Sequence, residues 1–159
     1  MLGAMSREAW LLLHILGVVL FLGNIIVTAV WKVLADRTQS PPVVAYAQRL
    51  VTITDIGFTA TGVILIIVAG QVLADDYGGV FSGPAWLTWG WSLFVASGLI
   101  WIAVLIPLEV MQARLAQEFR DAPTIPDRYW RLSRLWAIFG AIATALPLVN
   151  LYLMIFKPA

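Results

Sequence analysis

Hydrophobic residues run without a charge through four long stretches of the chain, and the charged residues lie between them. The uncharged stretches are residues 9–31, 56–74, 77–108 and 135–156. A helix needs about 20 apolar residues to cross roughly 30 Å of hydrocarbon, and each stretch is of that order or longer. The runs are continuous rather than alternating, which argues against membrane β-strands. The pattern predicts transmembrane helices at about 9–34, 54–74, 86–108 and 135–156.

Small and polar residues follow one face of the first predicted helix. The small and polar members are His14, Gly17, Asn24 and Thr28, and Phe21 and Trp31 complete the stripe. All six are spaced by three and four residues, which places them on one side of a helix. In the last predicted helix, Ala137, Ala141 and Ala145 recur at intervals of four. Helices in lipid associate by close packing at small residues and by hydrogen bonds. We therefore predict an all-α fold, an integral membrane antiparallel four-helix bundle, as a single transmembrane domain over 1–159.

Composition supports a location in the membrane and limits the chemistry. Hydrophobic residues make up 61% of the chain and charged residues only 12%, against about 25% charged in soluble domains. There is no cysteine, so disulfides, thiolate metal sites and c-type haem attachment are excluded. The first apolar run is longer than the roughly 7–15 residues typical of a secretory signal, so we expect it to stay as a helix.

The distribution of basic residues predicts the orientation. Eight of the ten flank the first and third connections: Lys32, Arg37, Arg49, Arg114, Arg120, Arg128, Arg131 and Arg134. The middle connection carries Asp75 and Asp76 and no basic residue. By the positive-inside rule, loops 35–53 and 109–134 are cytoplasmic and both termini face outward across the inner (plasma) membrane. The basic residues then face lipid headgroups, and no nucleic-acid partner is expected.

Part of the first connection is compatible with a helix. It contains a break at Pro41 and Pro42 followed by VVAYAQRLV, which is partly amphipathic. We expect this segment to lie on the inner surface of the membrane before the second span begins.

His14 is the only histidine and lies in the outer half of the first span. The side chains expected at the same level are Gln71, Trp89, Ser92, Asn150 and Met154. One interpretation is a ligand or a proton-handling group. The other is a neutral imidazole that joins helices by bonding Gln71, Asn150 or a backbone carbonyl, as polar side chains in membranes commonly do. Both interpretations remain open from spacing alone.

Other polar residues within or near the spans suggest structural contacts. Asn24 and Thr28 are expected to fasten helices to one another. On the inner side, Asp55 and Glu109 are the acidic candidates, and Asp55 is expected either to pair with Arg134 or to accept a proton or cation. Asp55 lies too far from His14 along the bundle to work with it. No catalytic residue is predicted, since phosphate loops, H-E-x-x-H and nucleophile–base patterns are absent from the sequence, and no metal site is predicted.

Three stretches carry a resemblance to a known family: LHILGVVLFLGNIIVTAVWK, TDIGFTATGVILIIVAG and RYWRLSRLWAIFGAIATALPLVNLYLMIFKP. They resemble a bacterial family of predicted integral membrane proteins, domain of unknown function 2269. That family is similar to the CopD-like group, which includes copper-resistance proteins and the HemJ-type protoporphyrinogen oxidase. The resemblance implies that the Leu13-His14 pair matches a haem-associated histidine of the porphyrin-oxidising members. This chain departs from a two-histidine haem site because it has one histidine, so a five-coordinate haem, a His14/Met154 pair or a site shared between subunits remains.

Three hypotheses for function follow. The first is an accessory or assembly component of a membrane complex, in which polar residues serve packing and contacts with other subunits or with a second copy of the chain. The second is a haem- or porphyrin-associated redox protein that uses His14, with haem b as the candidate cofactor. The third is a small metal or solute transporter. The lipid bilayer is the one partner common to all three, and whether the protein is an enzyme is left open.

Overall fold

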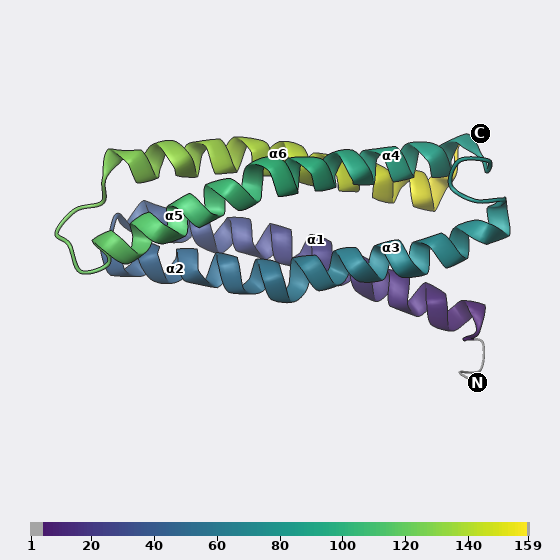
Figure 1. The fold of residues 1–159 in the computed structure, drawn as a ribbon, viewed down its shortest axis with the longest axis horizontal. Coiled ribbons are helices and arrows are strands. Elements are labelled where there is room, and N and C mark those ends of the chain that lie inside the picture. The colour runs from purple at the N-terminus through teal and green to yellow at the C-terminus, as the bar shows by residue number, and fades with distance from the viewer. Residues whose placement is uncertain (1–4, 159) are drawn as a thin grey trace.

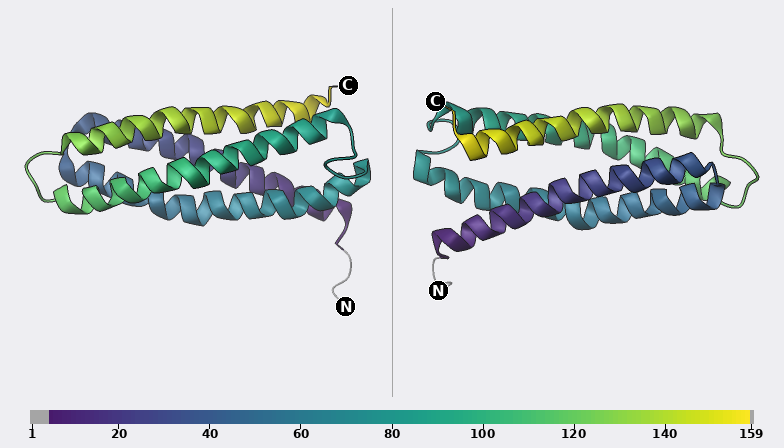
Figure 2. Two further views of the ribbon diagram at one scale, coloured as in Figure 1. Left: turned by 45° about the horizontal axis from the view of Figure 1, so that its top comes forward. Right: turned by 180° about the vertical axis from the view of Figure 1, so that it is seen from behind.

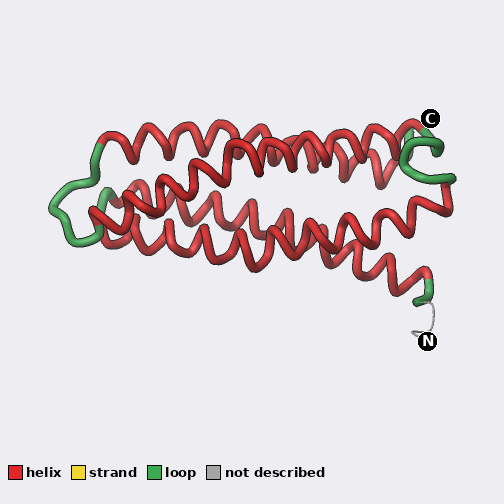
Figure 3. Tube along the Cα trace, in the orientation of Figure 1, coloured by secondary structure: helices red, strands yellow, loops and turns green. Residues whose placement is uncertain are grey.

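The computed structural model describes residues 5–158, and these form a long bundle of helices without a strand (Figure 1, Figure 3). In chain order the elements are α1 (Arg7–Thr38), α2 (Pro41–Thr54), η1 (Asp55–Ala60), α3 (Thr61–Ala74), η2 (Asp75–Tyr77), α4 (Ala85–Ile100), η3 (Trp101–Leu105), α5 (Ile106–Phe119) and α6 (Asp127–Phe156). The segments η1 and η3 are π-helical, and η2 is a short 3-10 helix.

These elements make four rods, each long and apolar enough to cross a membrane: Arg7–Thr38, Pro41–Tyr77, Ala85–Phe119 and Asp127–Phe156. The rods alternate in direction, so both ends of the chain lie at one end of the bundle (Figures 1 and 2). We call this the terminal end. The opposite end holds the connections 39–40 and 120–126 and many of the arginines, and we call it the basic end. The fold is the predicted all-helical four-span bundle.

The segment expected on the membrane surface instead forms the start of the second rod. α2 continues through η1 into α3 as one rod, which begins at Pro41. Both prolines stand in the first turn of α2, where a missing N–H does not disturb the helix. The cause is packing, because Val44 and Ala45 of α2 join Ala116, Phe119 and Tyr129 in a buried cluster at the basic end. The amphipathic face therefore covers other helices rather than the lipid surface.

Contacts between the rods differ between the two halves of the bundle. Toward the terminal end α1 packs mainly on α3, and α4 packs mainly on α6. Toward the basic end α5 also contacts α2 and α6, and α1 contacts α2. The bundle is thus joined across all four rods at the basic end, whereas at the terminal end it consists of two helix pairs.

Two glycines set the distance between α1 and α3. A Cβ placed on Gly17 would lie 2.9 Å from the carbonyl oxygen of Gly62, and one on Gly62 would lie 2.8 Å from the carbonyl oxygen of Gly17. Real Cβ atoms are not found so close to backbone atoms, so only glycine permits this approach. The two helices cross here with their backbones in contact, as membrane helices do at small residues.

Gly62→Ala should destabilise the protein, because the new methyl group forces two backbones apart. Overpacking of this kind costs about 1–3 kcal/mol. Gly23→Ala is the matched control, since a Cβ there meets nothing within 4 Å and alanine favours the helix. Thermal unfolding in detergent should show a lower midpoint for Gly62→Ala alone. Equal midpoints for the two variants would contradict the close crossing.

Candidate functional site

A cavity of about 420 Å³ opens between the two helix pairs in the terminal half of the bundle. We call it the outer cavity. Its walls are mostly apolar, and the residues that line it include His14, Val18, Ile66, Gly70, Gln71, Trp91, Phe94, Asn150 and Met154. The volume falls in the range of about 300–1,000 Å³ that is usual for small-molecule sites. The outer cavity therefore brings together His14, Gln71, Asn150 and Met154, whereas Trp89 and Ser92, expected at the same level, are not part of its lining.

His14 lines this cavity, and one of its two ring nitrogens bonds the backbone of α3. Its Nδ1 lies 3.2 Å from the carbonyl oxygen of Ile66 on α3. A carbonyl only accepts hydrogen bonds, so Nδ1 carries the proton and Nε2 keeps its lone pair. The Nδ1–Cε1 edge also packs on Gly70, where a Cβ would lie 3.1 Å from Cε1. Among the described residues Nε2 has no hydrogen-bond partner.

Of the partners considered for His14, the structure selects the backbone carbonyl. Gln71 and Asn150 line the same cavity, but neither bonds the imidazole. The Oδ1 atom of Asn150 is buried without a partner. It packs against Gly90 of α4, where a Cβ would lie 2.5 Å from it, and the methyl group of Met154 packs against the same glycine. Met154 thus belongs to the α4–α6 wall, whereas His14 belongs to the α1–α3 wall.

Two cations stand among the residues lining the outer cavity at the terminal end. Arg7 donates to Asp76 at 2.6 Å. Lys157 donates to the hydroxyl of Tyr77 at 2.8 Å, and its ammonium lies 5.3 Å from the ring centroid of Trp86. Lys157 therefore bonds a neutral hydroxyl and rests on aromatic rings.

Asn24 and Thr28 connect α1 with the second rod near the middle of the bundle. The amide of Asn24 donates to the hydroxyl of Thr59 at 2.9 Å. Thr28 donates to the Asn24 carbonyl oxygen at 3.2 Å. The polar stripe of the first span thus continues from His14 into a chain of hydrogen bonds between helices.

Asp55 does not pair with Arg134, which was one of its two expected roles. The indole N–H of Trp101 donates to Asp55 Oδ2 at 2.7 Å, and Arg134 is exposed. The reason is the rotation of α6, which turns the neighbouring Ser133 inward and Arg134 outward. Asp55 and Trp101 are the first residues of the two π-helices, so the irregular turns of two rods meet at this bond. Such turns often occur at functional sites.

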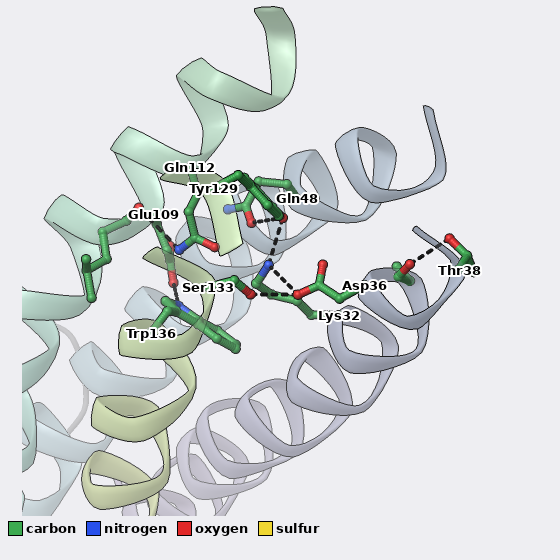
Figure 4. Close-up of polar contacts among 11 residues, drawn as sticks. Lys32, Asp36, Thr38, Gln48, Glu109, Gln112, Tyr129, Ser133 and Trp136 are labelled. Carbon is green, nitrogen blue, oxygen red and sulfur yellow. Dashed lines mark hydrogen bonds and ion pairs between the residues drawn. The ribbon is translucent and has the colours of Figure 1, made fainter. Parts of the chain in front are cut away.

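A buried polar cluster joins all four rods toward the basic end (Figure 4). We call it the inner polar cluster, and its members are Lys32, Asp36, Gln48, Glu109, Gln112, Tyr129, Ser133 and Trp136. Lys32 is only 1% exposed; its ammonium donates to the Tyr129 hydroxyl at 2.9 Å and lies 3.5 Å from Asp36 Oδ2. Ser133 donates to the same Asp36 oxygen at 2.6 Å. The Trp136 indole donates to Glu109 at 3.0 Å.

Sequence reasoning treated Lys32 only as a charge that sets orientation. One signal for its role was present, because Lys32 continues the stripe of the first span four residues after Thr28. Asp36 follows at the next interval of four, where a helix brings opposite charges together. Gln48, Gln112 and Tyr129 were missed because each lies in a connection that the charge pattern placed outside the spans.

Lys32→Met should strongly destabilise the protein, because it leaves the largely buried Asp36 carboxylate without its cation. Breaking a buried pair by removing one partner typically costs about 3–5 kcal/mol. The double variant Lys32→Met/Asp36→Leu should recover part of the loss. Arg120→Ala, which removes an exposed pair with Asp121, should leave unfolding in detergent unchanged. A Lys32→Met protein as stable as the wild type would contradict this assignment.

Comparisons with known proteins agree with this architecture. The family model described as "Predicted integral membrane protein (DUF2269)" matches residues 9–158. No curated protein and no solved structure matches the chain. Because the match runs through all four rods, from the start of α1 to the end of α6, the chain belongs to this family of integral membrane proteins.

Proposed function

We propose that the protein is a small haem- or porphyrin-binding membrane component in which His14 is the ligand to iron. The observation that carries the proposal is the state of the imidazole: Nδ1 bonds the Ile66 carbonyl, and Nε2 is left without a partner beside a cavity. Histidines that bind metals usually donate their other ring N–H in this way, which fixes the tautomer and the orientation of the ring.

The outer cavity suits a flat, largely apolar cofactor with an anionic edge. Trp91 and Phe94 stack on one wall, with ring centroids 6.3 Å apart and an angle of 29° between the rings. Gly70 and Gly90 keep Cβ atoms out of the walls next to His14 and Asn150. Arg7 and Lys157 stand at the terminal end, where they would meet carboxylates that project toward water. Bound haem would supply one-electron chemistry at its iron.

The chain's own residues would hold and shield such a group. His14 would bind through Nε2, and the Ile66 carbonyl would keep its ring in place. Met154, on the facing helix pair, is the candidate second ligand and is the weaker one, because its thioether packs against Gly90. The apolar walls would limit water near the cofactor. His14 is also the position to which the resemblance to CopD-like proteins points.

The cavity favours this hypothesis over the other two. Packing alone gives no reason for an imidazole nitrogen to be kept free beside an open volume. Metal transport needs several ligating groups along a path, whereas the lining of the outer cavity includes no Asp, Glu or second histidine. A role as one component of a larger membrane complex is compatible with haem binding and becomes part of the same proposal.

We further propose that the basic end of the bundle faces the cytoplasm, so that the outer cavity opens toward the outer face of the inner membrane. The support is the distribution of charge, since the connections at the basic end are rich in arginine and the middle connection has none.

Single cysteines test the orientation cleanly because the chain contains none. Ser82→Cys places a thiol in an exposed loop at the terminal end, and Thr124→Cys places one at the basic end. A maleimide that does not cross membranes should label Ser82→Cys in cells with a permeabilised outer membrane. It should label Thr124→Cys only after the inner membrane is opened. The reverse pattern would overturn the orientation.

Visible absorption of the detergent-purified protein tests haem binding. After purification from haem-replete cells, the wild type should show a Soret band, and His14→Ala should lose it. His14→Gln is the decisive variant, because its amide still donates to the Ile66 carbonyl and preserves stability but is a poor ligand for iron. Gln71→Leu, which changes another residue lining the cavity, should keep the band.

A structural role for His14 predicts a different result. The folded wild type would then be colourless and would take up no added haem, or His14→Gln would retain the same Soret band as the wild type. Either outcome contradicts the proposed function. Circular dichroism of each variant shows whether the helices have formed.

A further inference from the structure

From the π-helical turns to the basic end, the described part of the bundle interior holds three acidic side chains, Asp36, Asp55 and Glu109, and one basic side chain, Lys32. Lys32 pairs with Asp36, but Asp55 and Glu109 accept only from side chains without charge, namely the indoles of Trp101 and Trp136. No ion pair of the described residues includes either carboxyl group. Glu109 is 8% exposed, and Asp55 is half-buried. An ionised carboxylate removed from water is costly without a cation, so this pair calls for a compensating positive charge.

Both carboxyl groups line one cavity. It has a volume of about 510 Å³, lies between α1, η3 and α6, and is lined also by Asn24, Ser97 and Thr144. We call it the inner cavity. Phe21 lines both this cavity and the outer one, and its ring packs edge-on against Phe94 with centroids 6.0 Å apart. The carboxyl pair is thus separated from the His14 site by an aromatic wall.

Unpartnered polar atoms lead from this pair toward the basic end. Gln48 and Gln112 are both fully buried, yet Gln48 Nε2 and Gln112 Oε1 have no hydrogen-bond partner, and neither does Asp36 Oδ1. Figure 4 shows the two amides converging with Tyr129 and Lys32 between the helices. Buried donors and acceptors left in this way are ordinarily met by internal water. Tyr129 already connects the two sides, since it accepts from Lys32 and donates to Gln48.

We propose that Glu109 and Asp55 form a proton-binding pair that exchanges protons with the basic end through internal water in the inner polar cluster. A proton entering there passes along water held by Asp36, Gln48, Gln112 and Tyr129, and forms an O–H bond on Glu109. It reaches Asp55 through water in the inner cavity. Each indole holds one carboxyl oxygen, Glu109 Oε1 or Asp55 Oδ2, and leaves the other oxygen for the proton.

The groups around Glu109 are consistent with proton binding. The charged groups that act on it are Asp55 of η1 and Lys32 of α1. α6 contributes the Trp136 indole, and α5 contributes the neutral Gln112. Asp36 is separated from Glu109 by Lys32, and it already forms an ion pair with that lysine. One proton on the pair of carboxyl groups therefore reduces the surplus negative charge without breaking the Lys32–Asp36 contact. The site needs no cofactor and stands apart from haem binding.

Infrared spectroscopy of the protein in lipid nanodiscs tests this proposal. At neutral pH the wild type should show the carbonyl stretching band of a protonated carboxylic acid, and the band should shift when H₂O is replaced by D₂O. Glu109→Gln should remove most of the band, and Asp55→Asn should remove or shift the remainder. Glu118→Gln, which changes an exposed acid of the same helix, should leave the band unchanged. Gln112→Leu should keep the band but slow its exchange with D₂O.

Three results would overturn the proposal: no acid band in folded wild-type protein, a band that survives both Glu109→Gln and Asp55→Asn, or a band that never exchanges with D₂O. If Glu109→Gln fails to fold, glutamate labelled with ¹³C at its side-chain carboxyl gives the assignment in the wild type. Of the three glutamates, Glu8 and Glu118 are exposed, so an isotope shift of the acid band identifies Glu109. If the band does not shift and Asp55→Asn also leaves it unchanged, the proposal is contradicted.

Discussion

The backbone contact of α1 with α3 at Gly17 and Gly62 is the constraint on which the rest of the structure depends. Lipid gives apolar helices no preference for one another, so their association requires close contact or hydrogen bonds. His14 lies one turn before Gly17, and Ile66 lies one turn after Gly62. The crossing therefore brings the imidazole to the Ile66 carbonyl. A wider crossing would lose that bond and the orientation of Nε2 with it.

The two halves of the bundle serve different purposes. The terminal half consists of two helix pairs that leave between them the apolar cavity for which we propose a cofactor. The basic half is closed by hydrogen bonds and an ion pair that draw on all four rods, with Lys32 at the centre. Both π-helical turns lie between these halves and are joined by the Asp55–Trp101 bond. The contacts that join all four rods thus lie toward the basic end, and the outer cavity lies where only helix pairs are in contact.

The sequence predicted the four spans and the polar stripe of α1, because lipid demands long apolar runs and helical spacing is regular. It did not predict that α2 would continue the second rod, since an amphipathic face does not reveal whether lipid or protein covers it. Whether Ser133 or Arg134 faces the interior depends on the rotation of α6 about its own axis, and the packing of the helices sets that rotation. The sequence pattern also gave no sign that the N–H groups of Trp101 and Trp136 donate to Asp55 and Glu109, because an indole partner depends on how two rods face each other.

Nitrogen NMR of the single histidine tests the central claim most directly. Protein labelled with ¹⁵N-histidine gives ring signals from His14 alone, since no other histidine is present. The account predicts a neutral imidazole with a proton on Nδ1 and none on Nε2, and an Nε2 signal that changes when haem is added. A ring with its proton on Nε2 would contradict the bond to Ile66 and remove the ligand on which the proposed function rests.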